Sequence, residues 1–249
     1  MNKALFQIIK TADGSPSLEW ATTGEAMHNR MGAFAESVAL YGEAIENAVK
    51  TFNQLKLLSI GLGLGYNELI TASVCLKFNL KSFYIESFET DEILRMNFLN
   101  WLDGQEPSLK TCYDQILNLC ANYFLLNSSD IKNNLVKAYS NHQFNLRKQL
   151  NKDTVFTNKF NCILYDPFSA KTNPECWDED FLNNFLEKVC ESNCIFSTYA
   201  AKGTLKRSLK GQGFVVKNPP GFGGKRNSTY AYMLIQGLTS PNSSMRSKV

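Results

Sequence analysis

Three glycines at alternate positions are the first residues in this chain whose spacing indicates chemistry. Gly61, Gly63 and Gly65 follow the apolar run 57–60, LLSI, and a segment with helical spacing comes after them. Because glycine lacks a Cβ, it allows a strand to turn sharply into a helix while a ligand lies against the backbone. This spacing is typical of nucleotide-binding α/β folds, so it predicts a nucleotide-type cofactor at the end of the strand.

An acidic residue at a suitable distance from the glycines is the second feature. Glu86 lies 21 residues beyond Gly65, at the end of an expected strand over 82–86. A carboxylate offers two acceptors to the vicinal hydroxyls of a ribose, and nucleotide-binding folds place an acid at about this distance. Glu89 is a competing candidate for this role, and a surface glutamate at a strand end is the structural alternative.

A second acid ends another apolar run. Asp166 follows CILY at 162–165 and precedes Pro167 and Phe168. The carboxyl ends of parallel strands form the ligand crevice of an α/β sheet, so Asp166 is placed to meet a reacting group. A turn or a helix cap is the structural alternative for this aspartate.

The elements that would position these residues alternate between strand and helix, which predicts an α/β fold with a mainly parallel sheet. A turn at 13–16 separates two short extended segments, and the last two strands form an antiparallel hairpin after Pro219-Pro220. A helical insertion or cap is expected over about 107–145. One domain is expected over 1–239, followed by a mobile tail at 240–249. The expected strands lie at 55–60, 82–86, 144–149, 161–166, 193–198, 213–217 and 229–235, and the expected helices at 24–50, 66–79, 90–102, 178–191 and 202–210.

Composition indicates a water-soluble enzyme-sized domain. The chain has 249 residues, of which 44% are hydrophobic and 20% charged, which is ordinary for a globular protein. No run of 18 apolar residues predicts a membrane span, and the first residues show no signal peptide. Seven irregularly spaced cysteines indicate free thiols in a reducing cytoplasm. Cys190 and Cys194 lack a second ligand pair, so no metal is expected.

Charge is distributed unevenly along the chain. From Phe196 to the C-terminus there are nine Lys and Arg residues and no Asp or Glu, whereas the rest of the chain is net acidic. A basic end on an acidic body favours an anionic partner that contacts one side of the molecule, and a solvated lysine-rich face is the alternative.

Several further segments together resemble one family. The run 166–177, DPFSAKTNPECW, is similar to the D-x-F-S/A-P-x-x-N-P-x-x-W signature of the MnmC-like methyltransferases. The segments 11–18, TADGSPSL, and 25–36, EAMHNRMGAFAE, are similar to two N-terminal blocks of that family. The segments 198–201, TYAA, and 221–226, GFGGKR, are similar to two C-terminal blocks. These similarities occur in order along nearly the whole chain.

This resemblance implies a Rossmann-like fold and the cofactor S-adenosylmethionine (SAM). It implies the last methylation in making 5-methylaminomethyl-2-thiouridine at the tRNA wobble position, in a version without the FAD-dependent oxidoreductase domain of the bifunctional relatives. Asp166 would then face the amine that receives the methyl group. The residues implied to contact the cofactor are Gly61, Gly63, Gly65, Asn67, Glu86 and Asp153.

The implied substrate residues come from three blocks. His28 would line the site or make a structural hydrogen bond, and Phe168 would stack on a flipped uracil or pack in the core. Phe222, Lys225 and Arg226 would grip the anticodon stem-loop, because unstacked bases and phosphates need aromatic and cationic partners. A plain hairpin turn is the alternative for this loop.

Some residues depart from the family pattern. Ser59 stands where the family has an acid that can bind the ammonium of the cofactor, Asn29 replaces a serine, and Ala170 replaces a proline. Two other function classes stay open from the sequence. One is a SAM-fold enzyme acting on a small-molecule amine, as a methylase or an aminopropyltransferase. The other is a partner-binding module with a degenerate cofactor site.

Overall fold

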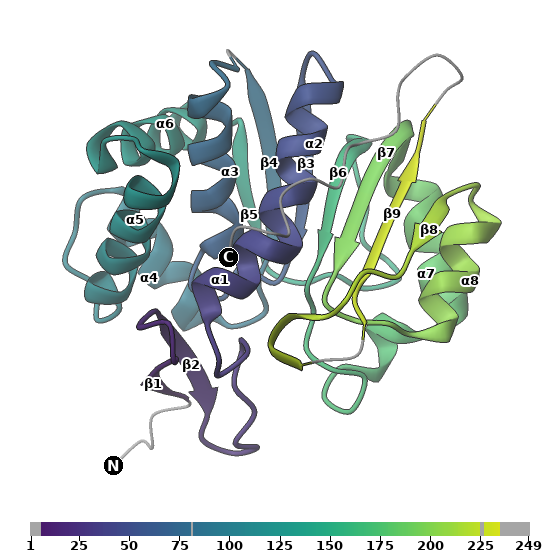
Figure 1. Cartoon of the computed structure of the whole chain (residues 1–249), viewed down its shortest axis with the longest axis horizontal. Coiled ribbons are helices and arrows are strands. Elements are labelled where there is room, and N and C mark those ends of the chain that lie inside the picture. Colours follow the sequence, from purple (N-terminus) through teal and green to yellow (C-terminus); the bar gives the residue numbers. More distant parts are fainter. Residues whose placement is uncertain (1–5, 81, 225–226, 235–249) are drawn as a thin grey trace.

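The expected alternation of strands and helices forms one seven-stranded sheet in the computed structural model, which describes residues 6–80, 82–224 and 227–234 (Figure 1). The order is β5-β4-β3-β6-β7-β9-β8. Only β9 runs antiparallel to its neighbours within this sheet, so the predicted mainly parallel sheet and closing hairpin are both confirmed. The strands are β3 (Leu55–Ile60), β4 (Phe83–Phe88), β5 (Phe144–Arg147), β6 (Phe160–Tyr165), β7 (Cys190–Thr198), β8 (Val215–Lys217) and β9 (Thr229–Met233).

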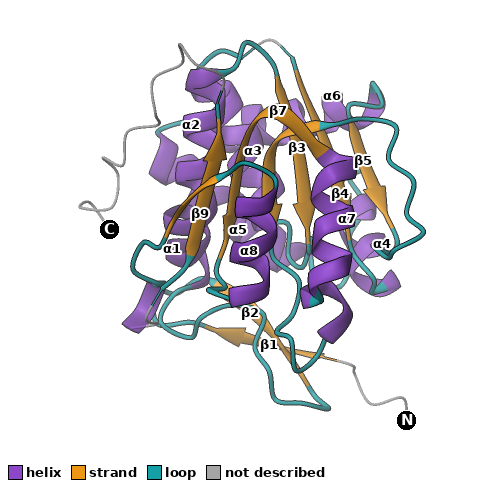
Figure 2. Ribbon diagram, turned by 90° about the vertical axis from the view of Figure 1, so that its right-hand side faces the viewer, coloured by secondary structure: helices purple, strands orange, loops and turns teal. Residues whose placement is uncertain are grey.

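Two helical layers bury the sheet, which explains why its central strands are apolar on both faces. On one face α2 (Glu43–Thr51) and α3 (Tyr66–Lys77) share a hydrophobic core with β3 and β4. On the other face α7 (Glu179–Val189) and α8 (Gly203–Gly211) pack against β6 and β7, in front of the sheet in Figure 2. Every residue of β6 is buried, as its continuous apolar sequence predicts.

The segment between β4 and β5 is helical, as expected. It forms α4 (Glu92–Leu102), α5 (Lys110–Phe124) and α6 (Ser128–Ser140), which widen the helical layer beside α3. The indole of Trp101 packs against Phe98 and Tyr113 and donates a hydrogen bond to Asp114 at 2.8 Å. This segment therefore extends the hydrophobic core on that face of the sheet.

The prediction of a helix from residue 24 is wrong at its start. The helix begins at Ala33, as α1 (Ala33–Ser37), and continues through a π-helical stretch, Val38–Gly42, into α2. Residues 25–30 instead follow the N-terminal hairpin, formed by β1 (Phe6–Lys10) and β2 (Pro16–Trp20). Their backbone groups bond to it, as in Met27 N–H to the Leu18 carbonyl at 2.8 Å, so they are not available for a helix.

The hairpin turn caps the first helix through side chains. The hydroxyls of Thr11 and Ser15 accept from the Ala33 backbone N–H, and the carboxylate of Asp13 accepts from the Ala35 N–H at 3.0 Å. The same carboxylate accepts hydrogen bonds from both hydroxyls. Although burial acts to raise it, the pKa of Asp13 is lowered because these hydrogen bonds favour the charged form. The hairpin thereby satisfies N–H groups that a helix cannot satisfy itself.

A buried carboxylate lies beneath the glycine loop. Glu68, in the first turn of α3, is fully buried, and its Oε1 accepts a hydrogen bond from the Ser87 hydroxyl of β4 at 2.6 Å. Burial raises the pKa of Glu68 to about 7, since a charged carboxylate is poorly solvated there.

We expect the cap to be a measurable part of the stability. Asp13→Ala removes a carboxylate that accepts backbone N–H groups, and such a change costs about 0.5–2 kcal/mol of the free energy of unfolding. Urea unfolding followed by circular dichroism measures this cost. The exposed Asp103→Ala is the control with little expected change. Equal stability of the two variants would show that the turn does not hold α1.

Glu68 should make stability depend on pH. The folded-state pKa of about 7 exceeds the usual value of 4.5, so the folded state holds the proton more tightly between these values. The contribution is complete below about pH 4.5 and is lost as the pH rises through about 7, by up to about 3 kcal/mol. Glu68→Gln should flatten this part of the curve of unfolding free energy against pH. An unchanged slope between pH 5 and 8 would contradict the assignment.

Candidate cofactor and substrate site

The glycine loop and Asp166 lie against each other at the carboxyl ends of β3 and β6. The Asp166 N–H donates to the Ile60 carbonyl at 2.9 Å. A Cβ on Gly61 would lie 2.5 Å from the Asp166 carbonyl oxygen, and Gly61 has a φ of 94°, so another residue fits there poorly. The contact fixes the loop beside the acid, and it places Asp166 directly after β6, where the sequence predicted it.

One cavity of about 550 Å³ opens at this edge of the sheet, a volume suited to a cofactor with part of a substrate. Residues from seven separate segments line it. They include Gly61 and Gly63 of the loop, residues 88–90 at the end of β4, residues 148–150 after β5, residues 25–30, the helical residues Glu36, Ser37 and Tyr41, residues 166–169, 173, 175 and 176 after β6, and Tyr199 after β7.

Glu89, the competing candidate, reaches the cavity, and Glu86 does not. β4 runs to Phe88, two residues further than expected, so Glu86 lies inside the strand. Its carboxylate pairs with Arg147 of β5 at 2.7 Å. Glu89 follows the strand and accepts from the Gly63 N–H at 2.9 Å, and burial raises its pKa. Among the described acids, Glu89 is therefore the one after β4 that lines the cavity.

The residues after β5 also differ from the expectation. Asp153 is exposed, and its backbone N–H donates to Asn151. Lys148, Gln149 and Leu150 line the cavity in its place, because β5 ends at Arg147 and they come directly after it. Leu150, with Phe88 at the end of β4, gives this end of the cavity an apolar wall suited to an adenine ring.

The other expected cofactor residues have separate roles. Gly65 is absent from the described lining of the cavity, and a Cβ there would collide with the Phe98 ring, so this glycine allows α3 to pack on α4. Ser59 is fully buried within β3. Asn67 lines the cavity from the first turn of α3 and is 3% exposed. Its Oδ1 has no hydrogen-bond partner among the described residues.

These features fit SAM. The glycine loop leaves backbone space beside Asp166, Glu89 offers acceptors for a diol, and the Asn67 Oδ1 offers an acceptor for an ammonium group. Gly61, Gly63, Asn67 and Glu89 are the residues of this chain that would hold the cofactor.

The expected aromatic residues lie at the other end of the cavity. The His28 ring is hydrogen-bonded to the Ser17 hydroxyl at 2.9 Å and packs on Tyr66, so it both lines the cavity and makes a structural hydrogen bond. Phe168 lines the cavity and packs edge-on against Trp20 of β2.

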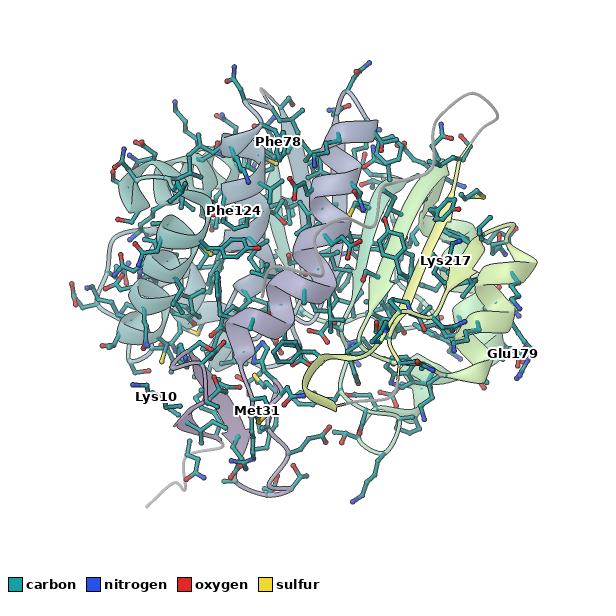
Figure 3. The ribbon with its side chains drawn as sticks, viewed as in Figure 1. Lys10, Met31, Phe78, Phe124, Glu179 and Lys217 are labelled. Atoms are coloured by element: carbon teal, nitrogen blue, oxygen red, sulfur yellow. The ribbon has the colours of Figure 1, made fainter. Side chains whose placement is uncertain are left out.

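Hydrogen bonds join the loops beside the cavity to one another. The Thr172 hydroxyl donates to Glu25 at 2.5 Å, and the Asn29 side-chain amide donates to the Phe222 carbonyl at 3.1 Å. Phe222 thus lies beside the 25–30 segment, whereas Lys225 and Arg226 lie outside the described residues. Met31, directly after this segment, is 60% exposed and lies with Lys10 at the hairpin end of the molecule (Figure 3).

Three functional candidates were not identified from the sequence. Tyr41 and Tyr199 line the cavity close to Asp166, and the pKa of each phenol is raised, first by burial and next by the Asp166 carboxylate. Glu36 lines the same end and is 5% exposed. Glu36 and Tyr199 belong to segments that resembled the family, which was a usable signal, but Tyr41 lies within an ordinary apolar helical pattern.

Within the described ranges, no cluster of three His, Cys, Asp or Glu side chains could hold a metal ion. All seven cysteines are buried free thiols. In residues 6–80, 82–224 and 227–234, no helix has the length and apolar character needed to cross a membrane.

Comparison with known proteins agrees with this site. Residues 128–234 match a family described as S-adenosyl-L-methionine-dependent methyltransferase. The chain is 25% identical over 219 residues to the tRNA 5-methylaminomethyl-2-thiouridine biosynthesis bifunctional protein MnmC of Campylobacter hominis, covering 82% of this chain and 29% of that protein. It is also 25% identical to an uncharacterized protein of Methanocaldococcus jannaschii, covering 90% of this chain and 59% of that protein. The chain thus spans less than two thirds of either relative.

Solved structures show the same fold. The crystal structure of MnmC2 from Aquifex aeolicus matches 97% of this chain and 73% of its own, with a TM-score of 0.68 and 25% identity. Spermidine synthase from Thermotoga maritima matches 96% of this chain and 70% of its own, with a TM-score of 0.54 and 14% identity, which shows a shared fold alone. The fold is therefore that of the Rossmann-like SAM-dependent methyltransferases.

Paired substitutions should separate the two acids of β4. Glu89→Gln should weaken SAM binding about 10- to 100-fold in isothermal titration, the range expected for a hydrogen bond to a charged group. Glu86→Gln, which loses only the pairing with Arg147, should keep wild-type SAM affinity. If Glu86→Gln weakens SAM binding and Glu89→Gln does not, Glu86 is the residue that binds the ribose.

Proposed function

We propose that this MnmC-like SAM-dependent methyltransferase domain methylates the primary amine of 5-aminomethyl-2-thiouridine at the tRNA wobble position. The observation that carries the proposal is the Asp166 carboxylate, held next to the glycine loop at the end of β6 and facing a cavity that is rich in acids. The relatives from Campylobacter hominis and Leptospira borgpetersenii are named for making 5-methylaminomethyl-2-thiouridine in tRNA.

The charge of the cavity favours a cationic substrate. Among its described lining residues there are five acids, Glu25, Glu36, Glu89, Asp166 and Glu175, and two cations, Arg30 and Lys148. Arg30 pairs with Glu19 of β2. A cavity with this balance attracts an ammonium group and disfavours a carboxylate or phosphate at the reacting centre.

The difference between the pKa of an alkyl amine and that of an aspartate limits the role of Asp166. An alkyl amine has a pKa of about 10 and an ordinary Asp about 4, so complete proton transfer between them would cost roughly 8 kcal/mol. Burial of an alkyl amine lowers its pKa, which reduces this cost. Asp166 therefore orients the amine and accepts its proton within the cavity. Orientation of reacting groups can contribute about 7–11 kcal/mol to lowering the barrier.

When bound, SAM supplies a methyl group on a sulfonium, and the sulfur keeps the electron pair of the bond that breaks. The amine nitrogen must approach this methyl group in line, with its lone pair free. The backbone of Gly61 packs against that of Asp166. This contact keeps the loop that would hold SAM beside the acid that would hold the amine. Phe168, at the mouth, would stack on the uracil ring.

Binding of tRNA is supported by the basic C-terminal part of the chain. Lys202, just before α8, Lys210 of α8 and Lys217 of the edge strand β8 are exposed, and Lys217 is labelled in Figure 3. Arg207 of α8 pairs with Glu179 at the start of α7. Cations gathered at one edge suit the phosphates of a stem-loop.

The direct test is methylation of tRNA that carries the aminomethyl nucleoside. Purified protein with SAM should convert 5-aminomethyl-2-thiouridine to its methylaminomethyl form, as measured by mass spectrometry of the digested nucleosides. Asp166→Asn should keep SAM affinity in isothermal titration while the rate falls about 10²–10⁴-fold. The exposed Asp153→Asn is the control.

Two results would overturn the proposal. One is a wild-type enzyme that leaves the tRNA unmodified while methylating a free polyamine, which would favour the small-molecule alternative. The other is an Asp166→Asn enzyme with the wild-type rate, which would remove the acid from the reaction.

A further inference from the structure

We infer that Glu36 is a second amine-binding carboxylate, which works with Asp166 to aim the amine lone pair at the methyl group and to restrict the reaction to one methylation. The inference rests on the proposed function, because it concerns the amine that this function places in the cavity. Glu36 would thereby contact the substrate from α1, which lies outside the sheet.

The position of Glu36 is fixed by structure on two sides. Its Oε2 accepts a hydrogen bond from the Asn29 backbone N–H at 2.6 Å, and the side chain is 5% exposed while lining the cavity. The first turn of α1, which carries it, is capped by Asp13 and Ser15 of the hairpin turn. A carboxylate held in this way can act as a directed acceptor.

Glu36 and Asp166 face the same part of the cavity. Tyr41 and Tyr199 both lie within the electrostatic reach of the two carboxylates: burial and then the Asp166 charge raise the pKa of each phenol, and the Glu36 charge raises it further, following the Glu25 charge in the case of Tyr199. All four side chains line the cavity. Two carboxylates and two phenols therefore surround one space beside the glycine loop.

The hydrogen-bonding capacity of an amine explains why two acceptors matter. The substrate enters as an ammonium with three N–H groups, and buried N–H groups need partners. One proton passes to Asp166, which leaves two N–H groups and one lone pair. If the unprotonated oxygen of Asp166 accepts one N–H and Glu36 accepts the other, the direction of the lone pair is fixed.

In the transfer step, one bond forms as another breaks. The nitrogen lone pair forms the new N–CH₃ bond as the methyl–sulfur bond breaks, and the electron pair of that bond stays on sulfur. The product is a secondary ammonium, and the proton on Asp166 passes to water. After deprotonation this product has one N–H, so it cannot satisfy both carboxylates while its lone pair points at a methyl group. A second methylation is therefore disfavoured.

The substitution Glu36→Gln tests this role with little change of shape. One carboxylate oxygen already accepts from Asn29, so the single carbonyl oxygen of Gln would take that bond and turn an NH₂ group toward the amine. We expect kcat/KM for aminomethyl tRNA to fall about 10- to 100-fold, as for a lost hydrogen bond to a charged group. SAM affinity in isothermal titration should stay at the wild-type value.

Glu46→Gln is the matched control. Glu46 lies ten residues along the same helical run, is equally buried at 5% exposure, and pairs with Lys50 outside the cavity. It should keep wild-type kcat/KM. If Glu36→Gln keeps SAM affinity and the wild-type kcat/KM, the inference is overturned.

A measurement on the wild-type enzyme keeps the test independent of any variant. Supplied with tRNA that already carries the methylaminomethyl nucleoside, it should form dimethylated product at least about 10-fold more slowly than it methylates the primary amine. Equal rates would refute the paired-acceptor arrangement. A wild-type enzyme with no activity on either tRNA would instead refute the proposed function.

Discussion

The contact between Gly61 and the backbone of Asp166 is the constraint on which the rest of the site depends. It joins the end of β3 to the end of β6, the two central strands, through the hydrogen bond from the Asp166 N–H to the Ile60 carbonyl. A side chain at position 61 would separate them. Because both segments continue central strands whose residues are almost all buried, the core holds the space for a cofactor and the acid beside it in one place.

The second part of the site comes from outside the sheet. The N-terminal hairpin caps α1 and holds residues 25–30 by backbone hydrogen bonds, so a wall of the cavity is built from a segment without regular structure. Two further loops contact this wall. Thr172 of one loop donates a hydrogen bond to Glu25, and Phe222 of the other accepts one from Asn29. The cofactor end is thus built on strands and the substrate end on loops, which suits a common cofactor combined with a particular substrate.

The cofactor end and the substrate end of the cavity share an excess of acidic residues. The cavity collects acids, and burial raises the pKa of Glu89 and of the two tyrosines beside Asp166. Buried acids without enough cations are costly in an empty protein and favourable when a cation binds, so the arrangement suits ligands that carry ammonium and sulfonium groups. The exposed Lys210 of α8 and Lys217 of β8 lie away from this cavity, and β8 is the edge strand of the sheet.

The sequence by itself determined the order of strands and helices, the glycine loop and the position of Asp166, because each depends on a local pattern: an apolar run, a turn residue and an acid directly after a strand. Only the tertiary structure decided between Glu86 and Glu89, because the end of β4 is set by its register with β3, in which Phe88 lies opposite Ile60. It likewise removed Asp153 from the cavity and brought in Glu36 and Tyr41. These side chains reach the site by packing across more than a hundred residues of sequence, and no local pattern records which face of a helix will meet a distant strand end.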